Sequence, residues 1–201
     1  MALNDNALTT LAACKEHLDI PTLTTTYDDK IEMLINVASN LIENYCNRTF
    51  RELTYTDQDY DGNNQSDLLL RHSPVSSVSS VYVDSSREFS ATFLVDSDEY
   101  AIVEPCILRR HNGTWPLASR NVRITYDAGY STMPDDVAYA CILFVEFLYR
   151  SRTDRRLGRV SQSKGNESVH YHMNIPFEIT AMIDPYIRFE FGTQRKSSWT
   201  T

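Results

Sequence analysis

A helix predicted over residues 134–150 has apolar side chains on two faces, and this feature most constrains the fold. A surface helix needs only one apolar stripe. At helical spacing, one stripe here is Val137, Cys141, Phe144 and Leu148, and the second is Ala138, Ile142, Val145 and Tyr149. One stripe can pack on the chain's own core, and the other needs a second cover. We therefore expect subunit-interface residues on this helix: Val137, Ala138, Cys141, Ile142, Val145 and Tyr149.

Three further helices are predicted, over residues 9–19, 27–46 and 176–183. Thr9 or Thr10 can cap the first, and Thr26 can cap the second. The second helix follows a 3.6-residue apolar period most closely, through Tyr27, Ile31, Leu34, Ile35, Ala38, Leu41, Ile42 and Tyr45. The short final helix ends at the sequence Asp184-Pro185.

Between the helical segments, residues 50–127 alternate short β-rich runs with turn residues. The runs are 68–71, 78–83, 93–95, 106–110 and 122–126. Asn112-Gly113 is a hairpin signal, and Asp84-Ser85-Ser86 can form a turn. We predict an α+β fold with one domain over residues 1–185: a helical core of two N-terminal helices, one long late helix and a short C-terminal helix, with an inserted antiparallel β element. A C-terminal arm follows over 186–201.

The net charge of −8 over 201 residues argues against a protein that grips nucleic acid over a broad surface. It is compatible with the wall of a tube through which DNA slides. The four cysteines form no C-x-x-C pair and are expected to be reduced and mostly buried. The N-terminus does not resemble a signal peptide, and no apolar run is long enough to span a bilayer.

Two constellations resemble metal sites. Asp57, Asp59 and Asp61, followed by Gly62, have the spacing of a calcium loop, but Leu68 stands where a bidentate Glu belongs. We interpret this segment as a solvated hairpin tip with Gly62 at positive φ. His170-x-His172 lacks a further ligand at a recognisable spacing. Nucleophile and nucleotide motifs are also missing, so we expect no catalytic residue, cofactor or metal and no enzyme. A metal-dependent enzyme stays a weaker alternative.

Basic residues gather after the long late helix, in a segment predicted as a loop over 150–164. In so acidic a chain this is a strong local asymmetry. It fits either a solvated helix C-terminus or a contact with a partner or with DNA in a channel. The candidate channel or partner residues are Arg152, Arg155, Arg156, Arg159 and Lys164.

Four segments occur in a definite order. They are LTTLAACKEHLDI, then YDDKIEMLINVASNLIENYCNRTF, then LLLRHSPVSSVSSVYV, and finally VRITYDAGYSTMPDDVAYACILFVEFLYRSR with GRVSQSKGNESVHY after it. Together they resemble the head–tail connector (adaptor, head-completion) proteins of long-tailed double-stranded-DNA phages, over roughly residues 8–185. The resemblance implies a virion neck protein, assembled in the host cytoplasm as a twelve-fold ring beneath the portal. DNA would pass through the ring without sequence recognition.

The implied partners are the portal protein, a downstream neck or tail protein, and other copies of the chain, with no membrane. The arm over 186–201 has large apolar residues without a long period, so we expect it to order on a partner. The expected portal-docking residues are Ile187, Arg188, Phe189, Phe191 and Trp199. Two alternatives stay open: a tail-proximal neck or stopper protein, and a nucleic-acid-binding accessory protein that uses the basic cluster.

Overall fold

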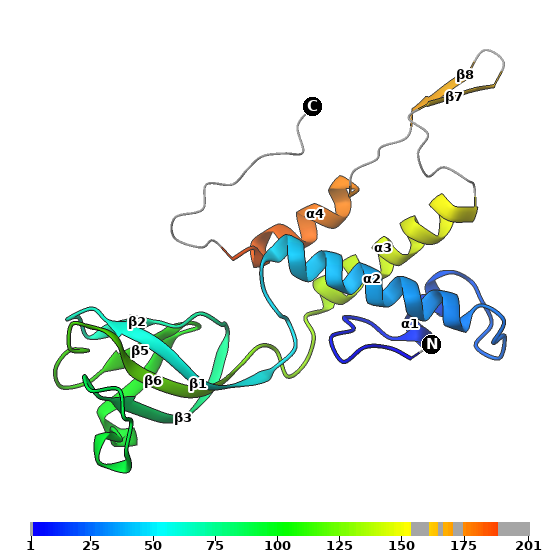
Figure 1. Cartoon of the computed structure of the whole chain (residues 1–201). Helices are drawn as coiled ribbons and strands as arrows, with labels where there is room; N and C mark the ends of the chain where they lie inside the picture. Colours follow the sequence, from blue (N-terminus) through cyan, green and yellow to red (C-terminus); the bar gives the residue numbers. More distant parts are fainter. Residues whose placement is uncertain (1, 154–160, 165–166, 171–174, 189–201) are drawn as a thin grey trace. The chain divides into compact units, whose positions relative to one another are not determined.

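The computed structural model describes residues 2–153, 161–164, 167–170 and 175–188. The chain divides into two compact units (Figure 1). A helical unit comprises Met1–Arg48 and Met133–Thr201, and a β unit comprises Thr49–Thr132. The predicted α+β fold is confirmed, and the predicted β insertion over 50–127 corresponds closely to the β unit.

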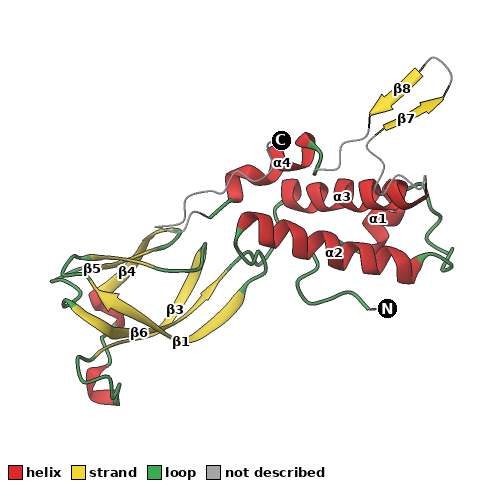
Figure 2. Ribbon diagram, turned by 45° about the horizontal axis from the view of Figure 1, so that its top comes forward, coloured by secondary structure: helices red, strands yellow, loops and turns green. Residues whose placement is uncertain are grey.

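Four helices form the described core of the helical unit, drawn red in Figure 2. They are α1 (Leu11–His17), α2 (Asp28–Cys46), α3 (Asp135–Thr153) and α4 (Phe177–Ile183). A 3-10 turn over Asp184–Tyr186 follows α4. Helix α3 lies against α1, α2 and α4, so three elements cover its sides. A short hairpin of β7 (Ser161–Lys164) and β8 (Glu167–His170) interrupts the segment that was predicted as a loop.

The two N-terminal helices begin differently. Thr10 caps α1, because its side-chain oxygen accepts from the Ala13 amide at 3.2 Å. Of the two predicted caps, Thr9 and Thr10, the structure therefore confirms Thr10. The predicted cap at Thr26 is wrong: α2 begins after Tyr27 without a side-chain cap bond. Asp28 and Asp29 occupy its first turn, where the positive end of the helix dipole stabilises their negative charges.

Helix α2 buries the centre of its predicted apolar stripe. Ile31, Ile35, Ala38 and Ile42 are fully buried. Leu41, predicted to follow the same period, is 41% exposed. Successive residues of a helix are rotated by about 100° about its axis, so residues spaced three and four apart form a broad stripe and not a single line. The described core covers only the centre of this stripe, and Leu41 lies at its uncovered edge.

The β unit contains two three-stranded antiparallel sheets, drawn yellow in Figure 2. One sheet has the order β1-β6-β3, from β1 (Leu53–Gly62), β6 (Ala118–Ala128) and β3 (Val75–Val83). The other has the order β2-β5-β4, from β2 (Asp67–Leu69), β5 (Ile107–Arg110) and β4 (Tyr100–Glu104). A buried cluster that includes Trp115, Leu108 and Ile124 forms its core, and the Trp115 indole N–H donates to the Ser66 carbonyl at 2.8 Å.

Several β predictions need correction. Strands β1 and β4 were not predicted, because both are edge strands with mostly exposed positions and no clear apolar alternation. The predicted run 93–95 is not a strand, since a 3-10 turn spans Ala91–Phe93. Asn112-Gly113 lies between β5 and β6, which do not pair, so it forms a turn but no hairpin.

The predicted turn at Asp84 is confirmed. Its carboxylate accepts from the amides of Ser86 and Glu88, each at 2.8 Å, and from the Phe89 amide at 3.0 Å. Burial raises the pKa of Asp84, but the hydrogen bonds from the Ser86 hydroxyl and from these amides stabilise the charged form more strongly and lower the pKa to about 2.

Candidate assembly surfaces

Helix α3 contributes residues of both stripes to the core of its own unit. Val137, Cys141 and Phe144 of the first stripe are buried, as that stripe predicts. Val145 of the second stripe is also buried, at 1% exposure. Three of the expected interface residues, Val137, Cys141 and Val145, therefore belong to the core of the helical unit. The physical reason is that α1, α2 and α4 together cover α3 on several sides.

The remainder of the second stripe is only partly covered. Ala138, Ile142 and Tyr149 are half-buried. Their expected role at a subunit interface stays a prediction, and it no longer includes Val145 as an accessible residue. Tyr139, on the same helix, is more exposed and packs edge-on against the His17 ring.

The first residues of the predicted C-terminal arm are attached to the helical unit. The Tyr186 hydroxyl donates to the Asp136 carboxylate at 2.8 Å, and the Arg188 amide donates to the Cys46 carbonyl at 2.8 Å. Ile187 and Arg188 are half-buried. The other portal-docking candidates, Phe189, Phe191 and Trp199, lie outside the described residues. A truncation that spares the helical unit should therefore begin after residue 188.

Most side chains of the basic cluster are not among those that the structure describes. Arg155, Arg156 and Arg159 lie outside the described residues, and the structure does not describe the side chains of Arg152 and Lys164. Arg150, at the start of the segment, is exposed and pairs with Glu146 one helical turn earlier, at 2.7 Å. A channel or partner contact by this cluster stays a prediction.

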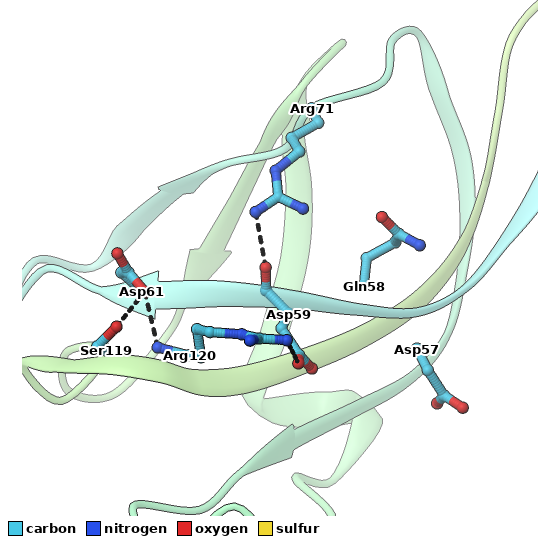
Figure 3. A pocket seen from close by; sticks show the side chains of 7 residues that line it. All are labelled: Asp57, Gln58, Asp59, Asp61, Arg71, Ser119 and Arg120. Atoms are coloured by element: carbon cyan, nitrogen blue, oxygen red, sulfur yellow. Dashed lines mark hydrogen bonds and ion pairs between the residues drawn. The ribbon is translucent and has the colours of Figure 1, made fainter.

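The aspartate-rich segment lies in strand β1, and Figure 3 shows its side chains beside a polar hollow. The predicted hairpin tip is wrong, because these residues pair with β6. Gly62 is also not at positive φ, which is found at Asp57 instead. Glycine is needed at 62 for a different reason: a Cβ there would collide with the Pro116 carbonyl oxygen.

Arginine side chains and backbone donors bind the carboxylates of Asp59 and Asp61 in this segment. Asp59 pairs with Arg123 at 2.8 Å and with Arg120 at 2.9 Å, and Asp61 accepts from the Arg120 amide at 2.7 Å. The hydrogen bond from Arg123 lowers the pKa of Asp59 below its ordinary value of 3.8. Within the described residues no group of three or more His, Cys, Asp or Glu side chains is placed to hold a metal ion. The side chains of the predicted pair His170 and His172 are not described.

The expected state of the cysteines is confirmed. All four are free; Cys14, Cys46 and Cys141 are buried and Cys106 is half-buried. Burial raises the pKa of the three buried thiols to about 12, so these side chains stay protonated at neutral pH. No helix among the described residues has the length and apolar character to cross a membrane.

Two features of the helical unit were missed from the sequence. Lys15, in α1, is buried and bonded to the loop that follows, and Leu23 in that loop is 94% exposed. The only sequence signals were a lysine within the apolar period of α1 and a single leucine among threonines. Neither signal identifies a contact, because the partners of Lys15 are mostly backbone carbonyls.

Comparison with known protein families identifies the family of this chain. The model of the head completion protein family matches residues 7–189. The chain belongs to the head completion protein family. This confirms the family resemblance seen in the sequence. No curated protein matches the chain.

Solved structures share the fold of this head completion protein. One is the neck of an empty GTA (gene transfer agent) particle computed with C6 symmetry: its chain is 17% identical, each chain covers 96% of the other, and the TM-score is 0.56. Another is the neck of a native GTA particle computed with C12 symmetry, at 18% identity and TM-score 0.55, with 96% of this chain and 99% of that chain covered. At such low identity these similarities show a common fold.

Proposed function

We propose that this chain is a structural protein of a phage neck, where copies of it form an adaptor ring between the portal and the next neck protein. The single observation that supports this most is the family match, which extends over nearly the whole chain. A ring is further supported by the likeness to chains from GTA necks that were computed with C6 and C12 symmetry. A twelve-fold ring is the form we propose, assembled in the host cytoplasm and retained in the virion neck.

The proposed ring has a structural role and no chemical reaction. DNA passes through its centre without sequence recognition. The net charge of −8 supports this, because a negatively charged protein surface does not bind the phosphates of DNA over a broad area. We expect the isolated protein to bind DNA more weakly than about 10⁻⁶ M at physiological salt, the tight end of ordinary non-specific binding.

Native mass spectrometry of the chain, alone and with purified portal protein from the same phage, tests the proposal. We expect a ring of this chain on the portal without any other neck protein. Binding only after a different neck protein has been added would instead identify a tail-proximal stopper. Tight DNA binding that depends on the basic cluster, without portal binding, would identify the nucleic-acid-binding alternative.

A further inference from the structure

Lys15 is a buried cation that fixes the loop between α1 and α2. Its side chain is 3% exposed. The ammonium donates to the Thr22 carbonyl at 2.9 Å, to the Thr24 carbonyl at 2.7 Å and to the Asp28 carboxylate at 2.7 Å. A lysine ammonium has three donors, so each of them has a partner here. Burial of a charge is costly without such partners, so this arrangement fixes the loop conformation strongly.

The position of Leu23 follows from these bonds. The carbonyls of its two neighbours, Thr22 and Thr24, both accept from Lys15, and the Thr24 amide donates to the Pro21 carbonyl at 2.9 Å. The residue between them is left 94% exposed. Leu23 contributes almost no burial to its own fold, although its backbone is fixed. A residue whose backbone is already fixed loses less conformational freedom when a partner covers it than a residue of a mobile loop does.

A second uncovered apolar feature lies on α2. Met33, Val37 and Leu41 are spaced four residues apart and are 37%, 41% and 41% exposed. We call these three residues the α2 stripe. Of the exposed residues beside the stripe, Asn40 and Asn44 are uncharged, and the charged Asp29 and Lys30 lie at its N-terminal end, one turn before Met33. From Met33 to Asn44 the exposed positions of α2 carry no charge, and depletion of charged residues is typical of the centre of a protein interface.

We propose that Leu23 of one copy packs on the α2 stripe of the next copy in the ring. This inference rests on the ring of the proposed function. A closed ring of more than two identical chains uses heterologous contacts, in which two different surfaces of the same chain meet. Among its described residues the helical unit has two strongly exposed apolar side chains, Leu23 and Phe177, besides the α2 stripe, and Leu23 is the one that lies between two carbonyls held by Lys15. The remaining residues of the second α3 stripe are less exposed than the α2 stripe, because Ala138, Ile142 and Tyr149 are half-buried.

Cysteine cross-linking on the assembled ring tests the contact directly. The double variant Leu23→Cys/Val37→Cys is assembled on the portal protein and oxidised. We expect a ladder of covalent oligomers, because each cysteine of one copy would lie beside its counterpart on the next. The control pair Leu23→Cys/Glu16→Cys uses an exposed position on α1 and should give no more ladder than the wild type. The wild-type chain measures the background from the native thiols.

Point variants test the proposed roles of the two residues. Leu23→Ser should fold normally and assemble about tenfold more weakly or worse, as expected for loss of a central apolar contact. Lys15→Met keeps the length of the side chain but removes the three bonds that fix the loop, so it should weaken assembly similarly. Glu16→Met is the matched control, because Glu16 is an exposed charged residue on the same helix as Lys15, and it should assemble like the wild type.

The outcomes separate this inference from the proposed function. Normal ring assembly by Leu23→Ser would overturn the proposed contact. The same conclusion would follow if the double-cysteine variant formed normal rings but gave no ladder of covalent oligomers. Either result would leave the proposed ring itself intact. If the wild-type chain forms no ring with or without portal, the proposed function fails and the contact with it. Any instability of Lys15→Met does not affect the decision, since Leu23→Ser and the cross-link decide it alone.

Discussion

The helical unit and the β unit are stabilised in different ways. In the helical unit, repeating apolar positions on α2 and α3 form the core, and the most deeply buried charge among the described residues is a lysine bonded mainly to backbone carbonyls. In the β unit, single polar side chains fix local structure: Asp84 holds a turn, and Asp59 joins β1 to arginines of β6. The comparison teaches that a periodic pattern specifies the elements of the helical unit, whereas the β unit combines an apolar cluster with single polar side chains that fix particular turns and strand pairs.

The largest effect is expected from Val145→Asp in the helical unit. The carboxylate would be buried without a partner, so we expect a loss of at least about 4 kcal/mol in stability. Tyr139→Asp, on an exposed position of the same helix, should cost about 1 kcal/mol or less. Hydrogen exchange of the α3 amides measures both. A folded Val145→Asp chain that only fails to assemble would return Val145 to the subunit interface.

Trp115→Ala is the corresponding change in the β unit. It removes a fully buried side chain and its bond to the Ser66 carbonyl, so we expect a loss of about 3–5 kcal/mol. Exchange protection of β6 should fall strongly. Unchanged protection there would mean that polar pairs, and not the apolar cluster, dominate the stability of this unit.

Asp59→Asn should have a smaller effect that depends on pH. Loss of the pairs with Arg123 and Arg120 should cost about 1 kcal/mol at neutral pH, since both arginines are partly exposed. The folded-state pKa of Asp59 lies below the ordinary value of 3.8, so its stabilisation is present above that pH. It is lost as the pH falls through the lower folded pKa. Denaturant unfolding at pH 7 and pH 3 should therefore show a smaller difference between wild type and variant at pH 3, and an equal difference at both would contradict the ion-pair explanation.

The smallest effects compare two threonines before the N-terminal helices. Thr10→Ala removes the cap of α1 and should cost about 0.5–1 kcal/mol. Thr26→Ala should be nearly neutral, because α2 has no side-chain cap bond. Thermal unfolding of the two variants side by side measures the difference. A loss for Thr26→Ala equal to that for Thr10→Ala would show that Thr26 stabilises α2 after all.

The sequence by itself determined the α+β class, the four helices within a few residues, and the family. The reason is physical: helices such as α2 depend on contacts that recur every three or four residues, so their signal is local. The turn at Asp84 was predictable for the same reason, since its carboxylate bonds amides two to five residues away.

Only the tertiary structure decided which apolar and charged positions face solvent. The pattern of α3 could not show that Val145 is buried, because α1, α2 and α4 come from distant parts of the chain. Strand β1 owes its conformation to pairing with β6, more than fifty residues later, whereas the sequence suggested a solvated hairpin tip for its aspartates. Lys15 and Leu23 show the same limit. Backbone carbonyls hold Lys15, and every sequence has those, so only their placement in space reveals the contact.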